Sequence, residues 1–224
     1  MAGWPERFAV VSPLPAVIPL FPLPNVVLFP GMALPLHVFE PRYRDMLRDA
    51  LAGDGVIGMV LLRGDWQARY YGRPEIFRAG AAGRVVRHES LPDGTSDILL
   101  AGLREFEVEE EYRDRSYRYA RVRWREEDAG SLPPAERRKL AGLARAYLEH
   151  GAGPAWAAAV AAADVADERY VNAFCQAMHV PPVEKLWLLE AASTSERCRR
   201  LCDLLEFGIE EAKLRAGGGG GRAH

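Results

Sequence analysis

The chain has 224 residues, a net charge of −2 and 49% hydrophobic residues, a balance typical of a globular protein with one or two domains. Without a basic excess, it does not fit the class of proteins that hold their partners mainly through phosphate contacts. No apolar run reaches the roughly 20 residues of a membrane helix, and residues 1–5 do not begin a signal peptide. Three cysteines make no disulfide framework, so we expect a cytoplasmic protein.

The first half of the chain consists of short apolar runs separated by prolines and glycines, which predicts strands joined by turns. Prolines in the earliest runs predict irregular strands there. A helix is expected to begin at Pro41, a favoured first helical residue, and to end before Gly53. Its apolar face consists of Tyr43, Met46, Leu47, Ala50 and Leu51. The strands predicted around this helix are residues 17–20, 26–29, 34–38 and 56–62.

A β-hairpin is the clearest local prediction. Residues 84–89 lead into Pro92-Asp93-Gly94, and residues 98–101 return. Residues 106–112 and 117–125 alternate between apolar and charged side chains, which predicts two further half-buried strands. A phase slip between Tyr119 and Ala120, in the second of these, predicts a β-bulge.

After residue 134 the hydrophobic period becomes that of helices. The spacing of Ser193 and Glu196 predicts a capping box that opens the last helix. The apolar stripes are Leu140, Leu143, Ala144, Tyr147 and Leu148, then Tyr170, Val171, Phe174 and Met178, then Cys198, Leu201, Cys202, Leu205 and Ile209. We therefore predict an α+β fold with a β-rich subdomain at residues 8–128, a helical subdomain at residues 131–214 and a disordered tail at residues 215–224.

Several segments, which follow one another along the chain, together resemble the N-terminal domain of the ATP-dependent Lon proteases. The first two are Ile18 to Met32, IPLFPLPNVVLFPGM, and Leu34 to Tyr43, LPLHVFEPRY. The others are Gly80–Val86, Leu91–Thr95, Ala101–Phe106 and Glu184–Glu190. The resemblance extends over about residues 13–209, and the agreement of several motifs in order is more specific than any one motif.

This resemblance implies a PUA-like β pseudo-barrel with one helix, followed by a C-terminal helical bundle, and a role in recruiting protein or peptide substrates. The sequence contains no Gly-x-x-x-x-Gly-Lys-[Ser/Thr] phosphate loop and no residues for a peptidase domain. We therefore expect a stand-alone, non-catalytic copy of the domain without a cofactor. Its expected partners are unfolded or extended polypeptides, with full-length Lon protease as a further candidate. No membrane or nucleic-acid partner is expected.

Two surfaces are candidates for peptide binding. The connection over residues 66–79 carries the aromatic side chains of Trp66, Tyr70, Tyr71 and Phe77. Aromatic residues in a connection either plug the end of a barrel or bind apolar segments, and the sequence leaves both possibilities open. The second candidate is the helix face that begins at Arg42 and Tyr43.

Two patterns carry possible chemistry beside a structural alternative. His37 and Glu40 lie close enough in sequence for general acid–base work, but Glu40 can simply cap the helix while His37 ends a strand. The second pattern consists of two i,i+4 pairs, Cys175 with His179 and Cys198 with Cys202, which could hold zinc. Cysteines on apolar stripes are also expected as buried thiols. Neither a Gly-x-Ser-x-Gly nor a His-Glu-x-x-His motif is present, so no catalytic residue is predicted.

Arginines interleaved with aromatic residues over residues 113–125 suggest an alternative function, an RNA-binding regulator that uses this hairpin. The competing interpretation pairs these arginines across the hairpin with the glutamates of residues 105–111. The nearly neutral charge of the region favours the ion pairs.

Overall fold

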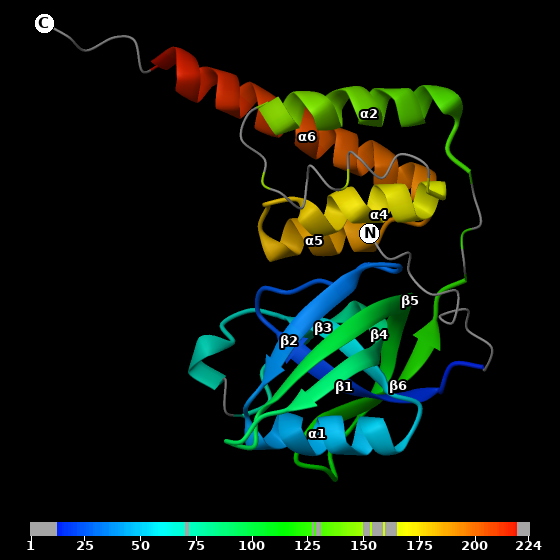
Figure 1. The fold of residues 1–224 in the computed structure, drawn as a ribbon, viewed down its shortest axis with the longest axis vertical. Coiled ribbons are helices and arrows are strands. Elements are labelled where there is room, and N and C mark those ends of the chain that lie inside the picture. The colour runs from blue at the N-terminus through cyan, green and yellow to red at the C-terminus, as the bar shows by residue number, and fades with distance from the viewer. Residues whose placement is uncertain are drawn as a thin grey trace, which may run out of the picture.

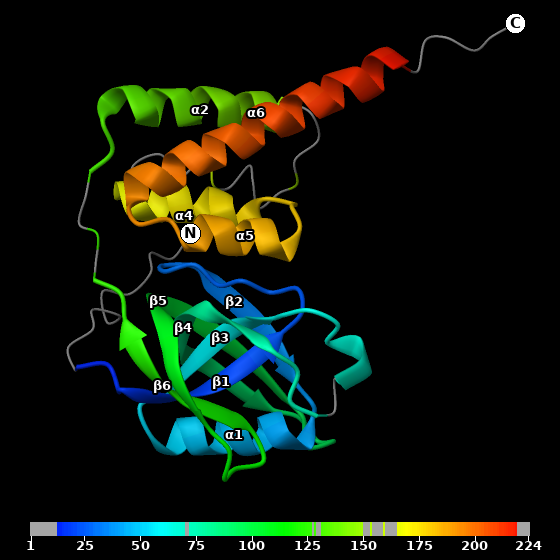
Figure 2. The same cartoon turned by 180° about the vertical axis from the view of Figure 1, so that it is seen from behind.

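The structure, a computed structural model, describes residues 13–69, 72–126, 128, 131–149, 153, 159 and 165–218. It is a mixed structure of helices and strands. The strands gather in one part, and all the labelled helices except α1 lie together beyond one end of it (Figures 1 and 2). The α+β character predicted from the sequence is therefore confirmed.

Within the described residues, six strands form one sheet in the order β2-β5-β4-β3-β1-β6. Because β5 also pairs with β6, the strands from β5 to β6 close on themselves and β2 remains at the edge. The strands are β1 (Val17–Leu23), β2 (Ala33–Val38), β3 (Val56–Leu62), β4 (Ile76–Ser90), β5 (Ser96–Tyr112) and β6 (Arg118–Trp124). Strand β3 is buried along its whole length, as its apolar run predicted, and it pairs parallel with β1 and antiparallel with β4.

The closed sheet is filled by a few large side chains that require glycines opposite them. A Cβ atom on Gly58 would lie 2.8 Å from Cζ of Phe106 and 2.8 Å from Cδ1 of Ile18. A Cβ atom on Gly80 would lie 2.4 Å from the carbonyl oxygen of Met59. These glycines leave the space that the fully buried Phe106 ring occupies.

Helix α1 (Pro41–Ala52) packs on β1 and β2 at the end of the sheet opposite the other helices (Figure 1). It begins at Pro41, as predicted, and Tyr43, Met46, Leu47 and Ala50 are buried. The prediction for Leu51 is wrong because its side chain lies at the rim of the buried face and is 40% exposed.

The remaining helices are α2 (Pro134–Glu149), α4 (Asp167–Ala177), α5 (Pro182–Leu189) and α6 (Thr194–Gly218). Helix α5 contacts β3 and β4, whereas α2 packs against α6 farther from the sheet (Figures 1 and 2). The Ser193 half of the predicted capping box is present, because Ser193 Oγ accepts from the Glu196 N–H; Glu196 Oε2 reaches back to the Ala192 N–H, one residue before Ser193. Helix α6 runs to Gly218, beyond the boundary expected at residue 214.

Three local predictions need correction. Residues 26–29 are not a strand, because Phe29 donates its backbone N–H to Gln176 Oε1 of α4 at 3.1 Å instead of to a neighbouring strand. The bulge lies on β5, between Val108 and Glu110, and not on β6. Buried and more exposed side chains alternate regularly along β6, because the Arg118 side chain points inward. Phe77 belongs to β4 and not to a connection.

Candidate functional site

The predicted aromatic surface is divided between two parts of the core. Trp66 is partly buried and packs against the apolar cluster inside the closed sheet. Phe77 is also partly buried but packs against the larger cluster shared with the helices, and the Arg63 guanidinium lies 5.8 Å from its ring centroid. Tyr70 and Tyr71 lie outside the described residues.

Arg42 and Tyr43, the second predicted surface, line a hollow of about 300 Å³ at the start of α1. We call it the arginine hollow. Its walls come from β1, from α1, from the residues before β4 and from the β5–β6 turn. The lining residues are Pro22, Arg42, Tyr43, Gly72, Arg73, Ser116, Tyr117 and Arg118.

Ion pairs and one cation–π contact hold the arginine hollow in shape. Arg42 donates from Nε at 3.0 Å and from Nη2 at 2.9 Å to Glu40 Oε2, and its guanidinium lies 4.6 Å from the centre of the Tyr43 ring. Arg118 Nη1 donates to Glu111 Oε2 at 2.8 Å. Burial lowers the pKa of Arg118, and its pairing with Glu111 opposes that shift.

A second hollow, of about 400 Å³, lies on the surface of β2, β5 and β4. We call it the β2 hollow. Its lining residues are Pro35, Leu36, His37, Arg87, Glu89, Asp97, Ile98 and Leu99. His37 Nδ1 and Asp97 Oδ1 are hydrogen-bonded at 2.7 Å on its exposed wall.

Phe39 is an exposed aromatic residue that lies in the chain between His37, which lines the β2 hollow, and Arg42, which lines the arginine hollow. Its side chain is 59% exposed, and its ring stacks on His37 with the centroids 6.0 Å apart. Residues 35–43, which we call the β2–α1 corner, therefore line the β2 hollow at one end and the arginine hollow at the other. The sequence interpretation missed Phe39. The alternation of β2, with Val38 buried, places Phe39 on the outward face and was the available signal.

His37 and Glu40 do not form the acid–base pair considered from the sequence. His37 pairs with Asp97, whereas Glu40 pairs with Arg42. The Glu40 side chain does not cap the helix either; its backbone carbonyl accepts from the N–H groups of Tyr43 and Arg44.

The free edge of β2 is poorly suited to adding another strand. Gly102 of β5 exchanges backbone hydrogen bonds with Gly31 and Met32, at 2.9 and 2.8 Å. Because hydrogen-bonding direction alternates along an antiparallel strand, Leu34 then faces β5 and Pro35 faces the free edge. Proline has no N–H to donate, and such residues protect edge strands against pairing.

The structure does not group the four residues of the zinc alternative. Cys175, Cys198 and Cys202 are buried, whereas the His179 side chain is exposed. Among the described residues, no three His, Cys, Asp or Glu side chains are grouped to hold a metal ion. Complete burial raises the pKa of Cys175 to about 12, as expected of a core thiol.

Arg118 and Arg123 of β6 form cross-strand ion pairs with glutamates of β5, as that interpretation of the hairpin predicted. In the β5–β6 ladder, Glu107 lies opposite Arg123, and their side chains are paired. Arg123 Nε also lies 3.7 Å from Glu109 Oε1. Glutamates of β5 therefore offset much of the positive charge on this face.

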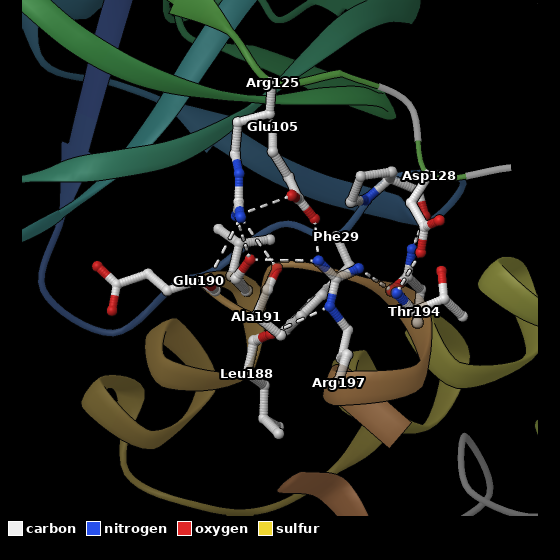
Figure 3. Close-up of polar contacts among 12 residues, drawn as sticks. Phe29, Glu105, Arg125, Asp128, Leu188, Glu190, Ala191, Thr194 and Arg197 are labelled. Atoms are coloured by element: carbon white, nitrogen blue, oxygen red, sulfur yellow. Dashed lines mark hydrogen bonds and ion pairs between the residues drawn. The ribbon is translucent and has the colours of Figure 1, made fainter. Parts of the chain in front are cut away.

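A polar cluster joins the sheet to the helices (Figure 3). Arg197 of α6 is buried and pairs through Nη2 with Glu105 Oε1 of β5. Its Nη1 donates to Asn172 Oδ1 at 2.6 Å, and its Nε donates to the Leu188 carbonyl at 3.0 Å. Asn172 in turn donates to the Pro30 carbonyl at 3.1 Å.

Arg125, which directly follows β6, completes this junction. It donates to Glu105 Oε2 at 3.1 Å and to the carbonyls of Leu189 and Ala191, each at 3.0 Å (Figure 3). Both carboxylate oxygens of Glu105 therefore hold arginines that also bind the end of α5. Hence the junction fixes the helices on the sheet.

The closed sheet with helices fixed at one end defines a mixed domain of the type seen at the N-terminus of Lon proteases. The N-terminal domain of Mycobacterium avium complex Lon protease has this fold, with a TM-score of 0.64 at 15% identity over 85% of this chain and 98% of that one. A Lon N-terminal domain protein from Xanthomonas campestris is similar at 26% identity, with a TM-score of 0.62 and the same coverage.

Residues 17–206 match the ATP-dependent protease La (LON) substrate-binding domain, and the chain belongs to this family. The Lon protease of Anaeromyxobacter dehalogenans is 29% identical over 90% of this chain and 24% of its own length. That of Cytophaga hutchinsonii is 32% identical over 48% of this chain and 13% of its own length. The chain thus spans a quarter or less of these relatives. In the described part, no helix is long and apolar enough to cross a bilayer.

Proposed function

We propose that this chain is a non-catalytic module that binds extended or unfolded polypeptides at the β2–α1 corner. The observation that carries this proposal is the exposed Phe39 ring, in the chain between residues that line two hollows. Exposed aromatic side chains at the centre of a contact surface supply much of the binding energy in protein interfaces. The family match to a substrate-binding domain supports the same class of partner.

Several finer assignments belong to the same proposal. The closed sheet is a PUA-like pseudo-barrel, the helices form a bundle that braces it, and the module works in the cytoplasm without a cofactor. Full-length Lon protease is a candidate partner. Trp66, Tyr70, Tyr71 and Phe77 form a second candidate surface, while Arg42 and Tyr43 already belong to the corner.

The test is a peptide-array screen followed by fluorescence anisotropy with the best apolar peptide. We expect Phe39→Ala to weaken binding about tenfold or more, as loss of an interface hot spot does. The control is Phe207→Ala, because Phe207 is also an exposed phenylalanine, 70% exposed on α6, and lies outside the corner. Equal losses in the two variants, or no loss in Phe39→Ala, would reject the corner as the site.

The RNA-binding alternative makes a different prediction, namely a binding signal that falls steeply with salt. The ion pairs between β5 and β6 count against it, because Arg123 and Arg118 already have carboxylate partners. Peptide binding that persists at high salt would leave no role for this alternative.

A further inference from the structure

We propose that the arginine hollow selects polypeptides that present a carboxylate, from an acidic side chain or from the C-terminus. This inference rests on the proposed polypeptide-binding function and names the chemical class that the corner selects. Among the described residues that line the hollow, Arg42, Arg73 and Arg118 are basic and none is acidic.

The carboxylates beside this hollow have partners other than Arg73: Asp45 accepts from Ser116 Oγ at 2.9 Å, and Asp49 accepts from the Tyr117 hydroxyl at 2.6 Å. Glu40 offsets Arg42, and Glu111 offsets Arg118. Arg73 has no carboxylate within ion-pair distance among the described residues. Its guanidinium instead donates to three backbone carbonyls of the β5–β6 turn, at 3.2, 3.4 and 3.2 Å. Arg73 is therefore a cation in the lining of the hollow without a carboxylate partner among the described residues.

Neighbouring groups do not supply the missing partner. Asp114, on the same turn, feels the charge of Arg73 but accepts its side-chain hydrogen bond from the Tyr119 hydroxyl. The charge of Arg73 also acts on the buried guanidinium of Arg118, so the two cations repel each other. A carboxylate that enters the hollow would relieve this repulsion and gain charge-assisted hydrogen bonds.

The position of the hollow adds a requirement on the ligand sequence. Arg42 follows Phe39 by only three residues in the chain. If an apolar residue of a bound peptide contacts Phe39, we therefore expect a neighbouring residue of the same peptide to reach the arginine hollow. The β2 hollow on the other side of Phe39 contains Leu36 and Ile98 and suits apolar side chains. We therefore expect the preferred ligands to have an acidic group close to an apolar segment.

The experiment uses the full chain and one apolar decapeptide in three forms: C-terminal amide, free C-terminal carboxylate, and amide with one internal glutamate. We expect at least one carboxylate form to bind about tenfold more tightly than the plain amide. This preference should disappear in Arg73→Gln, because glutamine keeps a donor for the turn but loses the charge. The internal and terminal forms distinguish the two sources of carboxylate.

Arg78→Gln is the matched control, because Arg78 is exposed, donates to the Glu109 carbonyl at 3.0 Å and lines neither hollow. Equal affinity for all three peptides would overturn the inference and leave polypeptide binding intact. A preference for carboxylates that persists in both Arg73→Gln and Arg42→Gln would place the subsite elsewhere and also overturn it. If none of the peptides binds, the proposed function itself fails at this corner.

Discussion

Arg197 of helix α6 and Glu105 of strand β5 form a buried ion pair that connects the helices to the sheet (Figure 3). The two residues are 92 positions apart in the sequence. Asn172, Arg125 and the carbonyls at the end of α5 complete the hydrogen bonding around them. A charge can be buried in this way because each nitrogen of the guanidinium donates to an acceptor: Glu105, Asn172 or a carbonyl at the end of α5.

Removal of one member of this pair should be strongly destabilising. We expect Glu105→Ala to lower the free energy of unfolding by about 3–5 kcal/mol, because it leaves the buried Arg197 without its counter-ion. Glu107→Ala is the control two residues along the same strand. Its pair with Arg123 is exposed, so its loss should cost less than about 1 kcal/mol. Urea denaturation of both variants measures the difference, and similar losses would contradict the assigned role of Glu105.

Glu105 should also make stability depend on pH. Burial raises the pKa of Glu105 above its ordinary value of 4.5, although Arg197 and Arg125 oppose the shift. The folded chain therefore binds this proton more readily than the unfolded chain does. Its contribution to stability is greatest below pH 4.5 and declines as the pH rises through the folded pKa. Urea denaturation at several pH values gives the free energy of unfolding of the parent and of Glu105→Gln. The difference, parent minus variant, should decline as the pH rises, and an increase with pH would refute the prediction.

Two glycine substitutions should have opposite effects. In Gly80→Ala the new Cβ atom would lie 2.4 Å from the Met59 carbonyl oxygen and 2.8 Å from Cζ of Phe106. We expect the free energy of unfolding to fall by about 1–3 kcal/mol, because the added methyl group overpacks the core. In Gly142→Ala, in α2, the new Cβ atom meets no atom within 4 Å. The free energy of unfolding should rise by about 0.5–1 kcal/mol, because alanine loses less backbone entropy on folding than glycine does. Thermal denaturation checks both signs; a tolerated Gly80→Ala would mean that the closed sheet is not packed as described.

The three thiols should be unreactive in the folded protein. Cys175, Cys198 and Cys202 are 0%, 1% and 3% exposed, and burial raises the pKa of Cys175 to about 12. A disulfide reagent such as DTNB at pH 8 should therefore label no thiol rapidly until denaturant is added. Arg197→Met, which loosens the junction beside α6, should accelerate labelling. Rapid labelling of any thiol in the parent protein would show that the helices open more readily than their packing indicates.

Local patterns in the sequence predicted most of the elements. The alternation of residues 106–112, the buried run at residues 56–62 and the helical stripe through Cys198 and Leu205 are short-range signals of which face is buried. The capping box at Ser193 and Glu196 is of the same kind. Such signals need no knowledge of what packs against the element, which is why these predictions agreed with the structure.

The sequence also predicted the family resemblance and the general pairing of the glutamates of residues 105–111 with the arginines of residues 113–125; the register that places Glu107 opposite Arg123 came from the structure. The sequence did not predict that the Arg118 side chain is buried. An arginine in a strand is expected to face solvent. Arg118 can be buried because it donates to Glu111 of β5 and to the carbonyl of Pro74, in the segment before β4. For this reason the bulge was assigned to the wrong strand.

The sequence by itself determined the class of fold, the apolar face of each main helix and the absence of a recognisable catalytic motif. Each of these depends on patterns among residues that are close together in the chain. Only the tertiary structure decided that Arg42 shares a hollow with Arg73 and Arg118, and that Phe39 remains exposed. It also decided that Glu105 meets Arg197. Those relationships depend on closure of the sheet through the β5–β6 pairing and on the docking of α5, with the helices packed on it, against the sheet. Contacts between distant segments leave no periodicity in a single sequence from which they could be predicted.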